Sequence, residues 1–152
     1  MLRDQIKESM KTAMKAKDEV GLATTRLIQA ALKDRDIAAR SKGNMDGIGE
    51  DEILGMLQSM IKQRRDSIEM YEKGGRPELA ERESREIDVI ETFLPEQMGA
   101  DAVNAAIDAV VKELGATSMK DMGRVMAVLK ERHAGSMDFG KASGQVKARL
   151  GS

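Results

Sequence analysis

Apolar residues recur at three- and four-residue intervals along most of the chain, which is the pattern of amphipathic helices. The spacing predicts helices over residues 2–17, 18–40, 50–73, 77–93, 101–114, 118–133 and 139–150. Aromatic residues make up only 2% of the chain, so Leu, Ile, Val, Ala and Met must fill the core, which favours helices over strands. We therefore predict an all-α protein with an N-terminal long-helix hairpin or bundle and a small C-terminal three-helix bundle.

The first two helices and the loop after them carry the main signals of the N-terminal half. A basic ridge runs along the first helix at four-residue spacing, and we interpret it as a solvated face: Arg3, Lys7, Lys11 and Lys15. The second helix has one apolar face, which consists of Val20, Ala23, Leu27, Ala30 and Ala31. Ile28 and Leu32 lie beside this face. Residues 41–49 hold three glycines and predict a mobile loop without a phosphate-binding motif.

A proline divides the chain into two helical parts. Pro95 cannot donate a helical hydrogen bond and disfavours helical dihedrals at Leu94, so the fourth helix should end near Phe93. We interpret Phe93, Leu94 and Pro95 as a hinge that separates a charged domain of residues 1–94 from a C-terminal domain of residues 100–152, with residues 95–99 as the linker. A helix-helix turn within a single domain is the alternative.

The composition limits the chemistry that the chain can perform. It has no cysteine and one histidine, His133, so thiolate sites, histidine metal sites and histidine triads lack their residues. The carboxylates lie on highly charged helical faces rather than among apolar residues, which argues against a tuned acid/base pair. We expect no catalytic residue, no metal and no cofactor. Without a signal peptide or membrane span, we place the protein in the cytoplasm and expect no membrane partner.

The charge distribution indicates one candidate surface. The formal net charge is -1, yet Lys and Arg outnumber Asp and Glu between Ala116 and Ser152. Such a local excess is typical of contact with a polyanion. The candidate RNA-binding residues of this stretch are Lys120, Arg124, Lys130, Lys141 and Lys147.

Three sequence motifs in a fixed order resemble the YqeY proteins, the stand-alone GatB/YqeY family. They are KQRRDSIEMYEKGGRPELA over residues 62–80, FLPEQM over residues 93–98 and MKDMGRVM over residues 119–126. The resemblance covers essentially the whole chain. The segment of residues 133–140 departs from the family pattern, because Met137 and Phe139 stand where a more basic turn is expected.

The resemblance implies a link to tRNA. The family is similar to the tail of the GatB component of the glutamine-dependent tRNA amidotransferase, a carbon-nitrogen ligase with glutamine as amido-nitrogen donor. That tail is a helical appendage that contacts tRNA and not the catalytic part. The resemblance thus implies that Lys120 and Arg124, four residues apart on one helical face, contact phosphates. Gly123 between them has no side chain and lets the RNA backbone come close to the helix.

Three functions follow in order of preference. The first is a tRNA-associated accessory module that recognises RNA by shape and phosphate contacts, with no DNA partner expected. The second is a protein-protein adaptor for an amidotransferase or an aminoacyl-tRNA synthetase, without direct RNA contact. The third is an enzyme of the amidotransferase class.

Overall fold

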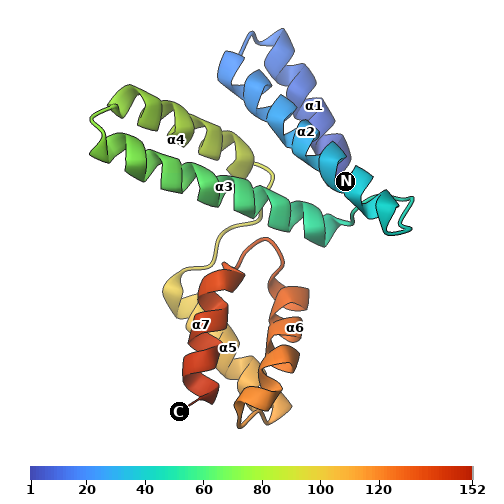
Figure 1. The fold of residues 1–152 in the computed structure, drawn as a ribbon, viewed down its shortest axis with the longest axis vertical. Coiled ribbons are helices and arrows are strands. Elements are labelled where there is room, and N and C mark those ends of the chain that lie inside the picture. The colour runs from blue at the N-terminus through green and yellow to red at the C-terminus, as the bar shows by residue number, and fades with distance from the viewer. Residues whose placement is uncertain (152) are drawn as a thin grey trace. The chain divides into compact units, whose positions relative to one another are not determined.

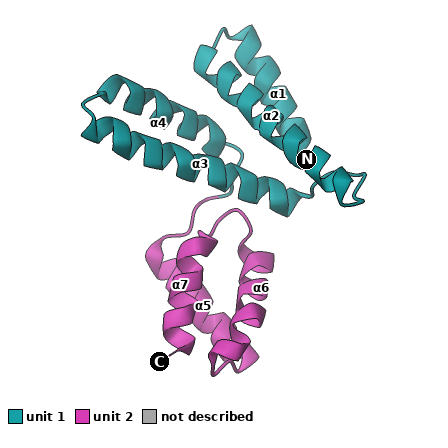
Figure 2. Cartoon of the chain, viewed as in Figure 1, with its two compact units in different colours: residues 1–95 teal, residues 96–152 magenta. Residues whose placement is uncertain are grey.

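The computed structural model describes residues 1–151 and contains only helices among them, which confirms the all-α prediction. The chain divides into two compact units, Met1–Pro95 and Glu96–Ser152 (Figure 2). Movement about Pro95, and the role of residues 95–99 as a linker between domains, stay predictions.

The first unit consists of two helical hairpins (Figure 1). Helix α1 (Leu2–Lys15) pairs with α2 (Glu19–Ser41), and α3 (Glu50–Lys73) pairs with α4 (Pro77–Glu91). Local signals set the ends of these helices: the Asp18 carboxylate accepts a hydrogen bond from the Gly21 N–H at 3.0 Å, and Pro77 occupies the first turn of α4.

The core of the first unit lies where the two hairpins meet. Ile6 of α1, Ile28 of α2, Leu57 of α3 and Ile90 of α4 are all within 1% of complete burial. Phe93, from the predicted hinge, is also buried in this core, and Leu94 packs against it. Helix α4 ends at Glu91, so the sequence prediction of its C-terminus near Phe93 is correct within two residues.

The orientation of α2 differs from the prediction. Its buried side is formed by Thr24, Thr25, Ile28 and Leu32, whereas Leu27 is 49% exposed. The apolar face identified in the sequence therefore points outward along much of its length. Threonine can replace an aliphatic residue on the buried side because the Thr25 hydroxyl donates to the carbonyls of its own helix at 2.9 and 3.0 Å.

The second unit packs three helices around a small aliphatic core. Helix α5 (Ala100–Leu114) and α7 (Phe139–Leu150) both contact α6 (Met122–His133), which follows the short 3₁₀ helix η1 (Met119–Asp121). Val125, Leu129, Met137 and Val146 are completely buried at the centre. Helix α5 ends at Leu114, and Gly115 follows it in the left-handed C-terminal conformation with a φ of 63°.

Candidate RNA-binding surface

The three arginines of the second unit each bind a carboxylate. Arg124 donates to Asp121 at 2.6 Å, and Arg149 pairs with Asp108. Arg132 makes two parallel hydrogen bonds of 2.7 Å to Glu113, which lower the pKa of that carboxyl below its ordinary value. Much of the positive charge counted in this stretch is therefore neutralised within the unit.

The four candidate lysines are arranged differently. Lys120, Lys130, Lys141 and Lys147 are all exposed, and none has a carboxylate within ion-pair distance among residues 1–151. Lysine is a flexible and strongly hydrated cation that suits a phosphate as a point charge. Of the five candidate cations in the second unit, the four lysines are therefore without an ion pair among residues 1–151. Arg124 already binds Asp121.

The common face predicted for Lys120 and Arg124 stays a prediction. Lys120 lies in η1 and Arg124 in α6, so the regular four-residue spacing of one α-helix does not connect them. Arg124 and Lys130 are six residues apart on α6, which turns them about 120° from each other around the helix axis. Lys141 and Lys147 have the same spacing on α7. The candidate cations therefore cover more than one side of these helices.

The start of α6 shows why the helix begins in two steps. The Asp121 carboxylate accepts hydrogen bonds from the Thr117 N–H at 3.0 Å and the Ser118 N–H at 3.4 Å, and Ser118 and Asp121 form a capping box. These bonds, together with that to Arg124, lower the pKa of Asp121. Next to this start, Gly123 is exposed, and a Cβ there would meet no heavy atom within 4 Å.

The segment that departs from the family pattern has a structural role. Met137 is completely buried, and Gly135 takes the left-handed conformation with φ of 80°. The turn accepts hydrogen bonds from the chain that enters α5: Met98 N–H donates to the Ser136 carbonyl at 2.9 Å, and the Gln97 amide donates to the Gly135 carbonyl at 2.7 Å. An apolar residue therefore replaces a basic one because this turn completes the core.

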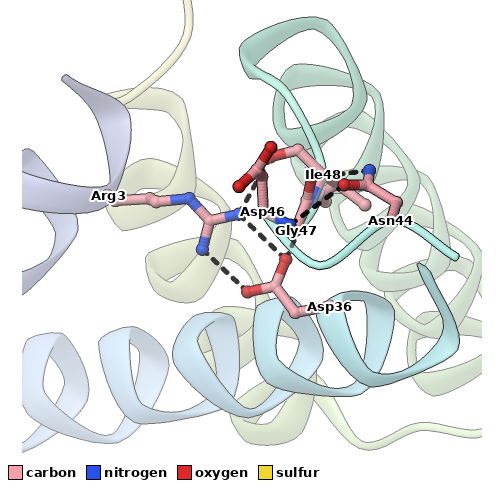
Figure 3. Close-up of polar contacts among 6 residues, drawn as sticks. All are labelled: Arg3, Asp36, Asn44, Asp46, Gly47 and Ile48. Carbon is pink, nitrogen blue, oxygen red and sulfur yellow. Dashed lines mark hydrogen bonds and ion pairs between the residues drawn. The ribbon is translucent and has the colours of Figure 1, made fainter. Parts of the chain in front are cut away.

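A polar cluster that the sequence did not predict lies in the first unit (Figure 3). Arg3 of α1 donates to both carboxylate oxygens of Asp36 on α2, at 2.7 and 2.8 Å, and to the Ile48 carbonyl at 2.9 Å. Asp36 also accepts from the Ile48 N–H at 2.9 Å. Mainly because of the Arg3 hydrogen bonds, the pKa of Asp36 falls to about 2. This cluster joins three chain segments.

The cluster also fixes the loop of residues 42–49. The Asn44 amide donates to the Gly47 carbonyl at 2.9 Å and accepts from the Asp46 N–H at 3.1 Å. Gly47 has a φ of 86°, and a Cβ at this position would lie 2.6 Å from an Asp36 oxygen. A glycine is therefore required where the loop passes over the carboxylate. Arg3, interpreted in the sequence as part of a solvated ridge, is instead a structural contact.

A second ion-pair cluster joins α3 and α4. Arg64, with a side chain only 12% exposed, donates to Glu86 at 2.9 Å and to the Met60 carbonyl at 3.2 Å. Glu83 lies 3.9 Å from the same guanidinium, and its pKa is raised by burial and then by the neighbouring Glu86 carboxylate. Arg64 therefore belongs to the packing of this hairpin.

No group of three or more His, Asp or Glu side chains within residues 1–151 is placed to hold a metal ion. None of the helices in this range combines the length and apolarity needed to cross a membrane.

Comparison with protein-family models decides the family. The model described as Yqey-like protein matches residues 3–150, nearly the entire chain. The chain belongs to the YqeY family. The resemblance identified from the three motifs is thereby confirmed.

Curated relatives of this YqeY protein include three yeast proteins named altered inheritance of mitochondria protein 41, mitochondrial. The protein of Lachancea thermotolerans is 35% identical over 72% of this chain and 55% of its own length. The Vanderwaltozyma polyspora protein is 31% identical over 77% of this chain and 64% of its own length, and that of Eremothecium gossypii is 32% identical over 74% and 60%. The matches thus span little more than half of these relatives.

The names of these relatives contradict the predicted cytoplasmic location, since each is called mitochondrial. The prediction rested on the expectation of neither a signal peptide nor a membrane span. A folded helical YqeY region does not carry such information, because organelle targeting is encoded by segments separate from the folded domain.

Proposed function

We propose that this YqeY protein is a tRNA-associated accessory module that contacts the phosphate backbone with its second unit. The main support is the state of its cations. Lys120, Lys130, Lys141 and Lys147 are exposed and have no carboxylate partner among residues 1–151, while the nearby arginines are paired. Lysines without a carboxylate partner retain their full attraction for phosphate. When they bind the phosphates of a nucleic acid, counterions are released from it.

Two glycines add support for a close approach. Gly123 on α6 and Gly144 on α7 are both exposed, and a Cβ at either position would find open space. A glycine within a helix costs about 1 kcal/mol relative to alanine. Since packing within the chain does not require either glycine, access for a partner backbone is a reason for both.

The proposed recognition is of shape and charge rather than of base sequence. Phe139 is the only aromatic residue after Pro95, and it is half-buried against the core of its unit. Stacking of unpaired bases on aromatic side chains is therefore not available to the second unit. Phosphates of a folded RNA can be bound by lysines on different sides of α6 and α7 as its backbone passes around them.

By similarity, the module serves a carbon-nitrogen ligase reaction of the tRNA amidotransferase type in a partner protein. We assign it no catalytic residue of its own. The adaptor alternative, in which the module binds an amidotransferase or an aminoacyl-tRNA synthetase without touching RNA, predicts that the chain alone does not bind tRNA even at low salt.

The experiment is a titration of the full chain with unfractionated tRNA at about 50 and 200 mM salt, read by fluorescence anisotropy of labelled RNA. Two to four phosphate contacts should weaken binding by about 10- to 150-fold over this salt range. Each of the variants Lys120→Ala, Lys130→Ala, Lys141→Ala and Lys147→Ala that removes a contact should reduce the salt slope by about one.

The matched control is Lys112→Ala. Lys112 is an exposed lysine of α5 in the same unit, outside the candidate set and without an ion pair among residues 1–151. Arg124→Ala tests whether the Asp121 pair yields to phosphate, which is expected because an exposed ion pair contributes under about 1 kcal/mol. Absence of tRNA binding at low salt, or equal losses in Lys112→Ala and the candidate variants, would refute the function proposed.

A further inference from the structure

The outward side of α2 carries an apolar seam that is half-buried at its N-terminal end and exposed from Leu27 onward. Ala23, Ala30 and Ile37 are seven residues apart, and Val20 and Leu27 alternate with them at three- and four-residue steps. Leu27 and Ile37 are 49% and 50% exposed. A repeat of this kind is the spacing with which a helix presents a seam to a second helix. Asp34 is the polar interruption of the seam.

One edge of this seam is lined with cations. Arg26, Lys33 and Arg40 are also seven residues apart, so they follow the seam along the same side of α2. Lys33 and Arg40 border a groove of about 370 Å³ between α1 and α2, together with Lys7. The carboxylate that lines this groove belongs to Asp36, and both of its oxygens accept hydrogen bonds from Arg3. Arg40 also acts on Asp36 through its charge, but none of Arg26, Lys33 and Arg40 has a carboxylate within 4.0 Å among residues 1–151.

The arginines of the whole chain set this edge apart. Every arginine outside α2 has a carboxylate within 4.0 Å. Among residues 1–151, the arginines without such a partner are all on α2, and they are Arg26, Arg35 and Arg40. Arg35 lies half a turn away from Arg26 around the helix and lines a different pocket. Arg26 and Arg40 are therefore the arginines of the basic edge that have no carboxylate within 4.0 Å among residues 1–151.

We propose that the outward face of α2 binds an amphipathic helix of a partner protein whose edge carries Asp or Glu at seven-residue spacing. The apolar seam supplies burial, and the basic edge selects acidic flanking residues and fixes the register. A helix accounts for both features, because phosphates alone leave Leu27 and Ile37 in water. The inference uses the first unit only and does not depend on RNA binding by the second.

The test uses the full chain and a defined probe. The probe is a fluorescein-labelled peptide of about four heptads with Leu at the two seam positions and Glu at both edges. A second peptide has Lys at the edges and the same Leu positions. Affinities are measured by anisotropy for the unchanged chain and for three variants: Arg26→Glu/Lys33→Glu, Leu27→Ser, and the control Lys62→Glu/Lys112→Glu.

The control pair reverses two exposed lysines that have no ion pair among residues 1–151 and lie off the seam, on α3 and α5. Its net charge therefore equals that of the seam variant. The altered residues are exposed or half-buried surface positions, so the variants should fold, which far-ultraviolet circular dichroism verifies.

The expected result has three parts. The acidic peptide binds the unchanged chain and the control variant alike, and it binds Arg26→Glu/Lys33→Glu at least about tenfold more weakly. The basic peptide prefers the charge-reversed variant, which rules out damage to the fold. Leu27→Ser weakens both peptides, since it removes part of the seam.

Four outcomes would overturn the proposal. They are no binding of the acidic peptide at about 1 mM, equal weakening in the seam and control variants, a concentration-dependent dimer that Leu27→Ser abolishes, and loss of tRNA affinity in Arg26→Glu/Lys33→Glu without any peptide binding. The third would assign the face to a second copy of the chain, and the fourth to nucleic acid. Failure of the tRNA function is read separately, from the lysine variants of the second unit.

Discussion

The Arg3–Asp36 contact makes the first unit sensitive to a single charge. Lowering the pKa of Asp36 from its ordinary 3.8 to about 2 corresponds to about 2.4 kcal/mol of stability at neutral pH. The Arg3 side chain is 35% exposed, so solvent screening reduces this to about 1–2 kcal/mol. We expect Asp36→Asn, which retains shape but not charge, to lower the free energy of unfolding by that amount at pH 7.

The stabilisation by the Arg3–Asp36 contact should decrease as the pH falls. The pKa of Asp36 is depressed in the folded state, so its stabilisation is fully present above the unfolded value near 4 and is lost as the pH falls through about 2. The difference between the unchanged chain and Asp36→Asn should therefore be constant from pH 7 to about pH 5 and shrink toward zero at pH 2.

The assay is urea unfolding followed by tyrosine fluorescence. Tyr71 is the only tyrosine and the chain has no tryptophan, so the signal reports the first unit. The control is Asp34→Asn, an exposed aspartate of the same helix without an ion pair among residues 1–151. A loss below about 0.5 kcal/mol at pH 7, or a loss that does not change with pH, would refute the assigned role of the charge pair.

Three further changes test other contacts. Arg64→Ala should cost about 2–3 kcal/mol by tyrosine-detected unfolding, because it leaves the Glu83 and Glu86 carboxylates facing each other; a neutral effect would contradict this. Gly115→Ala should lower stability by about 1 kcal/mol in thermal melts, since φ is 63° there, and an unchanged melt would show that the turn adapts. Thr24→Val should stabilise by about 1 kcal/mol, because the buried Thr24 hydroxyl has no hydrogen-bond partner among residues 1–151; destabilisation would imply that it has one.

Local signals in the sequence can predict the ends of several helices. Each of these signals affects only the backbone a few residues away, so it can be recognised without knowing the tertiary fold. They are Asp18, Pro77, Gly115 and the Ser118–Asp121 pair. Pro95 is a local signal of the same kind, and it is the last residue of the first compact unit. The number of helices, by contrast, followed from the spacing of the apolar residues.

The buried side of α2 could not be predicted in the same way. This helix has apolar residues on both sides, and Thr24 and Thr25 occupy the side that becomes buried. Periodicity favours the side with Leu27 and Ala30, because a hydroxyl bonded to its own helix is not visible in a hydropathy pattern. The Arg3–Asp36 contact was missed for a related reason: its residues are 33 positions apart, and regular spacing along α1 indicated a solvated ridge instead.

The candidate surface shows the limits of counting charges. A sequence treats Arg and Lys as equal cations, but a planar guanidinium binds a carboxylate with two parallel hydrogen bonds, as Arg3 and Arg132 do. Most arginines of the chain are therefore held in ion pairs, whereas the candidate lysines of the second unit are not paired among residues 1–151. An arginine without a carboxylate is consequently more informative than an unpaired lysine. By that criterion Arg26 and Arg40 indicate an acidic protein partner at α2 more strongly than the total charge indicates RNA, and the two surfaces can be separated because their variants alter different units.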